Sequence, residues 1–128
     1  MHTPITGHAV DLYDPETIRA TTGSFFALPS LRVPSHKELL PWLSGVRERL
    51  PALQVVGTSA AAERDVTCLD LRRPTVWLLG NETHGLSQAW REAADALVRI
   101  PIGGSASSLN VASAGSILLW ETSRQRRS

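Results

Sequence analysis

Four side chains in the second half of the chain could transfer a proton or hold a polar ligand. They are Glu82, His84, Ser108 and Asn110. Each also has a structural explanation. Glu82 could accept backbone N–H bonds in a loop, and His84 could be an exposed loop residue. Ser108 and Asn110 suit the cap and first turn of a final helix. Considered one at a time, the structural explanations are favoured.

Familiar catalytic and metal-binding patterns do not account for these residues. There is no Ser/His/Asp set with matched partners. The other histidines, at positions 2, 8 and 36, lack the spacing of metal ligands, and we expect no metal site. Cys68 is the only cysteine, which excludes an intramolecular disulfide and a thiolate zinc site.

Residues 80–87 come close to a phosphate-binding loop but depart from it at one position. They read Gly-x-x-x-x-Gly-Leu-Ser. A phosphate-binding loop needs lysine where this chain has Leu86, because the ammonium group meets the phosphates. No Gly-x-Gly-x-x-Gly block follows an apolar run either. The usual nucleotide-binding motifs are therefore unsupported.

Composition indicates one globular domain over residues 1–128. The chain is 42% hydrophobic and 20% charged with a formal net charge of +1, which is ordinary for a globular protein. It has no apolar run long enough to span a membrane and no secretion signal at its start, so we expect a cytoplasmic protein. Arg124, Arg126 and Arg127 cluster near the end of the chain. They could contact phosphate, although a frayed, solvated end is the favoured interpretation.

Apolar runs alternate with helical patterns along the chain. Strands are expected at 53–57, 76–79 and 97–100, with further extended segments at 25–28 and 31–33. Helices are expected to start at 14–16 and to cover 35–50, with a kink or delay at Pro41, then 87–95 and 109–123. This alternation is typical of an open, mostly parallel α/β sheet, in which ligands bind at the carboxyl ends of strands.

Three blocks in fixed order carry a family resemblance. They are Leu-Gly-Asn-Glu-x-x-Gly-Leu at 79–86, Ile-Pro-Ile at 100–102 and Ser-Ser-Leu-Asn-Val-Ala-x-Ala at 107–114. These blocks resemble motifs two and three of the SpoU family, S-adenosylmethionine-dependent RNA 2′-O-ribose methyltransferases of the SPOUT superfamily. The segments 10–15 and 19–29 look like the middle of the same family. The resemblance extends over nearly the whole chain.

The resemblance implies a fold, a cofactor and a site. The fold would be an open, mostly parallel α/β sheet with helices on both faces and a deep trefoil knot near the C-terminus. Asn110 and Glu82 match the family's polar active-site positions, and Ser108 lies beside them. The substrate would be rRNA or tRNA, and the protein would be a homodimer through the knot region. The residues expected around S-adenosylmethionine are Thr58, Ser59, Ala60, Leu79, Gly80, Asn81, Gly85, Ile100, Ile102 and Leu109.

One family block has no counterpart. Motif one, an Asn-x-Gly-x-x-x-Arg-type block, would be expected a few dozen residues before Val10, where this chain has nine residues. We therefore expect an N-terminally truncated domain, a degenerate member, or a dimer whose partner supplies the arginine. Three functions stay open: an RNA methyltransferase domain, a non-catalytic dimeric module that binds cofactor or RNA, and an unrelated small α/β nucleotide binder.

Overall fold

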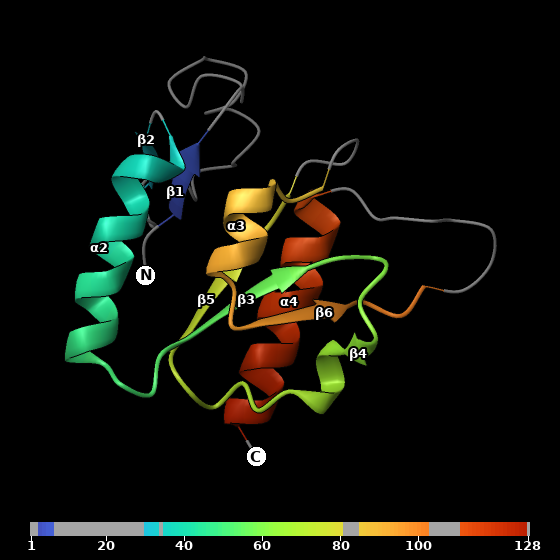
Figure 1. The fold of residues 1–128 in the computed structure, drawn as a ribbon. Coiled ribbons are helices and arrows are strands. Elements are labelled where there is room, and N and C mark those ends of the chain that lie inside the picture. The colour runs from blue at the N-terminus through green and yellow to red at the C-terminus, as the bar shows by residue number, and fades with distance from the viewer. Residues whose placement is uncertain (1–2, 7–29, 34, 81–84, 103–110, 128) are drawn as a thin grey trace. The chain divides into compact units, whose positions relative to one another are not determined.

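The computed structural model describes residues 3–6, 30–33, 35–80, 85–102 and 111–127 (Figure 1). Contacts within the chain divide it into two compact units, Met1–Gly45 and Val46–Ser128. The elements on which the candidate site depends lie in the second unit.

The first unit contains a small parallel sheet followed by a helix. Strands β1 (Thr3–Thr6) and β2 (Ser30–Val33) pair in parallel, which confirms the extended segment expected at 31–33. Helix α2 (His36–Arg49) follows, and its last four residues, 46–49, belong to the second unit. The helix is continuous across Pro41. The segments 14–16 and 25–28 lie outside the described residues.

Ser35 stabilises the start of α2, as its position before the helix predicts. Its hydroxyl oxygen accepts a hydrogen bond from the Lys37 N–H at 3.3 Å, which satisfies one of the amide groups that a helix leaves free at its beginning.

The second unit is built on a four-stranded parallel sheet. Its strand order is β4-β6-β3-β5, and every neighbouring pair is parallel. The strands expected at 53–57, 76–79 and 97–100 are confirmed within about one residue. The short strand β4 and a 3-10 turn were not predicted. The elements in chain order are β3 (Gln54–Thr58), β4 (Arg64–Asp65), η2 (Val66–Cys68), β5 (Thr75–Leu78), α3 (Gln88–Ala93), β6 (Ala96–Arg99) and α4 (Val111–Arg126).

Helices α3 and α4 cover opposite faces of this sheet (Figure 1). Val56 packs in a cluster with Leu118 of α4. Successive strand residues point to opposite faces, and the next residue, Gly57, faces the other way. A Cβ atom on Gly57 would lie 2.8 Å from Leu97 and 3.7 Å from Ala94, just after α3. The helices on both faces expected from the resemblance are therefore present.

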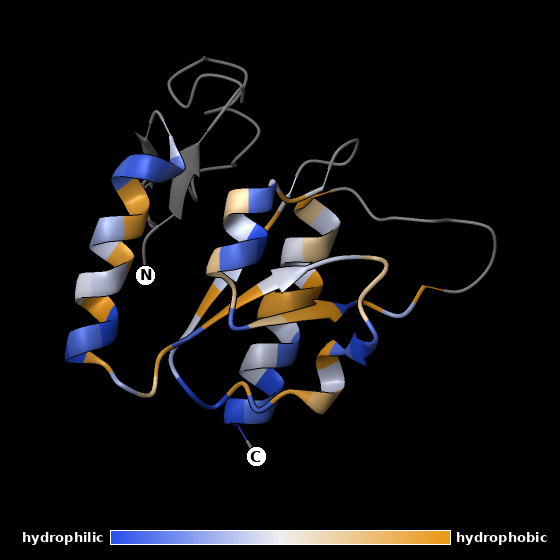
Figure 2. Cartoon of the chain, in the orientation of Figure 1, coloured by the Kyte–Doolittle hydropathy of each residue, from blue (hydrophilic) through white to orange (hydrophobic). Residues whose placement is uncertain are grey.

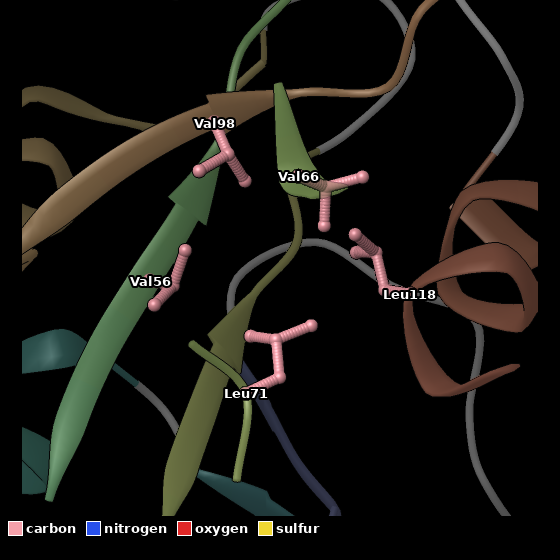
Figure 3. Packing of buried hydrophobic residues seen from close by; sticks show 5 residues of the cluster. All are labelled: Val56, Val66, Leu71, Val98 and Leu118. Carbon is pink, nitrogen blue, oxygen red and sulfur yellow. The ribbon is translucent and has the colours of Figure 1, made fainter. Parts of the chain in front are cut away.

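The core lies between the sheet and α4. Its buried side chains come from the strands, from the segment after β4 and from the helix, and they face one another in Figure 3. Hydrophobic residues concentrate in the strands, whereas the last turns of α4 are hydrophilic (Figure 2). The cluster comprises Val56, Val66, Leu71, Val98 and Leu118.

Helix α4 is fixed to the sheet by polar contacts in its second half. The indole N–H of Trp77 donates to the Thr122 hydroxyl at 3.2 Å. The Gln125 amide donates to the Leu69 carbonyl at 3.0 Å and accepts from the Leu71 N–H at 2.9 Å. Arg126 donates to the Leu71 carbonyl at 3.1 Å. The favoured interpretation of a frayed C-terminal end is therefore wrong for residues up to Arg126, because these contacts extend the helix beyond its predicted end at 123.

Asp95 ties the start of β6 to β3 and to the end of α2. Its carboxylate accepts from the Val55 N–H at 2.7 Å and from the Arg47 guanidinium at 3.0 Å. Its own N–H donates to the Val55 carbonyl at 2.7 Å. Burial raises the pKa of Asp95, but the hydrogen bonds from Val55 and Arg47 outweigh it and leave the pKa below its ordinary value.

Within the described part of the chain, no helix combines the length and apolarity needed to cross a membrane. Over the same residues, no three histidine, cysteine or acidic side chains are grouped so that they could hold a metal ion.

Candidate functional site

The carboxyl ends of β3, β5 and β6 meet at one edge of the sheet. The strands are parallel and adjacent, and their register aligns Gly57 with Leu78 and Thr58 with Val98. The chain leaves the edge after Thr58, after Leu78 and after Arg99. Loops that follow neighbouring parallel strands therefore lie side by side, which is where α/β sheets bind ligands.

Alternation along the strands defines one face of this edge. The side chains on the α4 side of the sheet include Val56, Trp77 and Val98. Two residues after each of them, in the same order, come Thr58, Leu79 and Ile100. They therefore continue the same face beyond the core. Ile100 packs against the core cluster, whereas Leu79 is 38% exposed.

The segment after β3 is a compact turn. The Ser59 N–H donates to the Val98 carbonyl at 3.0 Å, and the Ser59 carbonyl accepts from Ala62 N–H at 3.1 Å. The Ser59 hydroxyl accepts from the Ala61 N–H at 3.3 Å. The predicted cofactor residue Ser59 thus also holds its own loop in shape.

Two glycines form the tightest part of the edge. A Cβ atom on Gly80 would stand 2.6 Å from the Gly85 carbonyl oxygen and would collide with the Gly85 and Leu86 backbone. Gly85 has a φ of 65°, a left-handed conformation in which a side chain is strained. The chain therefore leaves and returns at almost the same point. This closure needs glycine at both positions.

Arg91 braces the return of this segment. Its Nε donates to the Leu86 carbonyl at 3.2 Å, and its Nη2 atom lies 3.9 Å from where a Gly85 Cβ would be. Ser87 stands at the N-cap of α3, as predicted, but its side chain makes no capping hydrogen bond there.

A second arginine lies at the same end of the sheet. Arg99, the last residue of β6, donates from Nε to the Asp65 carboxylate at 2.6 Å. This hydrogen bond raises the pKa of Arg99 above its ordinary value. Arg99 therefore remains positively charged, and its charge is offset by Asp65.

Helix α4 approaches the edge through Gly115. A Cβ atom on Gly115 would lie 3.3 Å from the Leu79 Cδ1 atom. The helix backbone and the Leu79 side chain are thus in contact, and the first turns of α4 border the edge.

The structure brings eight of the predicted site residues to this edge. Their side chains are apolar or uncharged, so a ligand would meet mainly backbone and apolar groups. The remaining predicted residues, Asn81, Glu82, Ser108, Leu109 and Asn110, lie outside the described residues. The residues at the edge are Thr58, Ser59, Ala60, Leu79, Gly80, Gly85, Ile100 and Ile102.

Comparison with models of protein families identifies the family of this chain. The model of the SpoU rRNA Methylase family matches residues 3–120. The chain belongs to this family. The resemblance of the blocks 79–86, 100–102 and 107–114 to SpoU motifs is therefore confirmed as family membership.

The chain is similar to several methyltransferases and RNA-modifying enzymes in sequence and in structure. A 23S rRNA uridine 2′-O-methyltransferase of Streptomyces viridochromogenes is 48% identical over 122 residues, which are 95% of this chain and 42% of that protein. The SpoU methyltransferase AviRb from the same organism, solved in complex with the cofactor AdoMet, matches with a TM-score of 0.91 at 46% identity, covering 98% of this chain and 49% of AviRb. The TrmH/SpoU tRNA modifying enzyme of A. aeolicus matches with a TM-score of 0.79 at 30% identity. The match covers 99% of this chain and 62% of the A. aeolicus enzyme.

The chain spans less than half the length of the two Streptomyces relatives, 42% and 49%. This chain therefore corresponds to only part of each of these relatives.

Sequence reasoning missed two residues that shape the edge. Arg91 had no signal, because a single arginine in a helical segment is ordinary. Gly115 had one, since glycine inside a helical pattern costs about 1 kcal/mol relative to alanine, and such a residue often marks a close contact.

Proposed function

We propose that this chain is an S-adenosylmethionine-dependent RNA 2′-O-ribose methyltransferase domain acting on rRNA or tRNA. The observation that carries the proposal is the closure of Gly80 on Gly85 at the carboxyl edge of a parallel sheet, within a chain of the SpoU family. AviRb, which has the same fold over 98% of this chain, was solved with AdoMet.

The edge fits such a cofactor. Gly80 and Gly85 allow a ligand to approach the backbone closely, and backbone N–H and C=O groups can recognise the edge of an adenine ring. Leu79, 38% exposed, and the half-buried Ile102 offer apolar surface beside it. We propose that Thr58–Ala60 and Leu109 complete this lining, together with Asn81 and Ile100.

The chemistry that we propose needs orientation and removal of one proton. When bound, S-adenosylmethionine supplies an activated methyl group. Asn110 and Ser108 would orient the ribose 2′-hydroxyl, and Glu82 would accept its proton as the oxygen bonds to the methyl carbon and the bond from that carbon to sulfur breaks. Correct alignment of the hydroxyl supplies much of the rate. This chemistry does not require a metal ion.

We also propose that residues 1–128 act as one methyltransferase domain with a trefoil knot that includes α4. The match to AviRb at a TM-score of 0.91 supports this. We propose that the protein acts in the cytoplasm, because its proposed substrates are rRNA and tRNA.

A second copy of the chain is the proposed partner of α4. Ile117, Leu119 and Trp120 lie within little more than one turn of this helix and are 38%, 50% and 59% exposed. Such a group of large apolar side chains is unfavourable in water and is typical of an interface. A homodimer would bury it.

Methyl transfer to unmodified RNA tests the function. The purified chain is incubated with radiolabelled S-adenosylmethionine and in vitro transcripts of 23S rRNA or tRNA, and 2′-O-methylation is read as resistance of one linkage to alkaline cleavage. Asn110→Ala should abolish transfer and leave cofactor binding intact. Ser44→Ala, at an exposed position of α2, is the matched polar control and should act like the wild type.

Three outcomes discriminate the alternatives. Transfer by Asn110→Ala at the wild-type rate would remove Asn110 from the site. Cofactor binding without transfer to any RNA would instead support a non-catalytic binding module. Preference for ATP or NAD over S-adenosylmethionine would contradict the proposed cofactor and support a nucleotide binder.

A further inference from the structure

Gly115 lies where the backbone of α4 meets Leu79 at the candidate site. The helix continues through it over Val111–Arg126, so the glycine is neither a cap nor a break. A Cβ atom there would lie 3.3 Å from Leu79 Cδ1, closer than the ordinary van der Waals separation of about 3.5–4.0 Å between carbon atoms. An alanine at 115 would therefore push on Leu79.

The helix itself has little freedom to retreat. Leu118, one turn further on, is fully buried in the core, and Thr122 accepts the indole N–H of Trp77 at 3.2 Å. Gln125 is bonded to the backbone of Leu69 and Leu71. Protein cores adapt poorly to added volume, so the displacement falls on the less constrained partner.

Leu79 is that partner. Its side chain is 38% exposed and stands at the end of β5, next to the Gly80–Gly85 closure. Leu79 directly follows β5 at the carboxyl edge, so a side chain displaced away from α4 would move toward the space proposed for a ligand on this edge.

We propose that Gly115 is a positioning residue that sets how far Leu79 projects into the cofactor site and so keeps that site deep enough for S-adenosylmethionine. This inference rests on the proposed function. It assigns to a residue inside α4 a role in binding that acts through Leu79, and it accounts for a glycine in a helix interior despite its low helix propensity.

The matched variants are Gly115→Ala and Gly45→Ala. Gly45 is also a glycine within a helix, α2, and among the described residues no neighbouring atom lies within 4 Å of its Cβ position. Both changes improve helix propensity, but only Gly115→Ala presses on another side chain. Affinities for S-adenosylmethionine and S-adenosylhomocysteine are measured by calorimetry, and Tm by thermal unfolding.

We expect Gly115→Ala to lower the affinity for the ligands without lowering the stability of the fold. Gly115→Ala should weaken both ligands severalfold, because Leu79 has to shift by a few tenths of an ångström, with a Tm no lower than that of the wild type. Gly45→Ala should bind normally. The double variant Leu79→Ala/Gly115→Ala should bind as tightly as Leu79→Ala alone, because the shortened side chain no longer needs to move.

The following outcomes would contradict the inference. Wild-type affinity in Gly115→Ala, or failure of Leu79→Ala to suppress its defect, would show that Gly115 does not act through Leu79. A loss of affinity accompanied by an equal loss of folded protein would make its role purely structural. Absence of binding by the folded wild-type chain would instead overturn the proposed function, and this inference with it.

Discussion

The backbone of Gly80 lies against that of Gly85, so that a Cβ atom on Gly80 would stand 2.6 Å from the Gly85 carbonyl oxygen. This contact closes the segment between β5 and α3 at the edge where the carboxyl ends of β3, β5 and β6 meet. It also gives a structural reason to expect Gly80 to tolerate no side chain. A side chain there would first distort the protein's own turn, before it reached any ligand.

Gly80→Ala should therefore impair binding and folding together. Overpacking of this kind costs about 1–3 kcal/mol, and we expect the free energy of unfolding to fall by that amount and S-adenosylmethionine binding to be lost. Chemical denaturation and calorimetry measure the two effects. Gly45→Ala, in open space, is the control. Normal affinity in Gly80→Ala would mean that the turn does not border the cofactor.

Asp95→Ala should destabilise the second unit. The Val55 N–H is buried and would lose its acceptor, the Asp95 carboxylate at 2.7 Å. An unsatisfied buried N–H costs about 1–3 kcal/mol, measurable by urea unfolding. Asp95→Asn keeps an oxygen for Val55 but loses the charge that pairs with Arg47, and it should retain most of the stability. Equal losses in the two variants would assign the effect to the ion pair.

Glu121 should make stability depend on pH in the acid range. Hydrogen bonds from Arg124, then Gln125, lower the pKa of this buried carboxyl from 4.5 to about 2. Because the pKa is lower in the folded protein, the stabilisation is complete above pH 4.5 and is lost as the pH falls toward 2. Tm measured across this range should fall less steeply in Glu121→Gln than in the wild type.

Glu48→Gln removes one negative charge from an exposed position of α2 and serves as the reference for the loss of charge alone. If Glu121→Gln and Glu48→Gln gave the same pH profile, Glu121 would have no special part in acid stability.

Trp120→Asp should weaken the proposed dimer. Trp120 is 59% exposed on α4, and a carboxylate at the centre of an apolar interface is costly to desolvate. We expect a shift from dimer to monomer in sedimentation, with unchanged circular dichroism. Trp120→Phe preserves the apolar surface and should remain dimeric. A wild-type chain that sediments as a monomer at all concentrations would exclude the homodimer.

The sequence predicted the central strands because their signal is local. β3, β5 and β6 are short apolar runs bounded by glycine, proline or polar residues, and burial in a parallel sheet requires little more. The same runs predicted the carboxyl edge of the sheet, because each apolar run is followed by glycine, proline or small residues that do not continue its pattern.

Tertiary contacts account for the features that the sequence did not predict. The two-residue strand β4, Arg64–Asp65, has no apolar pattern and exists through its pairing with β6. Helix α4 runs past its predicted end at 123, because Gln125 and Arg126 bond to the segment 69–73. Two neighbouring residues of α4 also reverse the order that hydrophobicity alone predicts. Glu121 is buried and Trp120 is exposed, and the buried carboxylate is paired with Arg124 of the same helix at 2.7 Å.

The measurement that bears most directly on the central claim is a calorimetric titration of the folded chain with S-adenosylmethionine and S-adenosylhomocysteine, with ATP and NAD as comparison ligands. Saturable binding of the first two at about one site per chain, with no binding of ATP or NAD, is the result that the Gly80–Gly85 edge leads us to expect. No binding of either methyl-cycle ligand, or a preference for ATP or NAD, would contradict it.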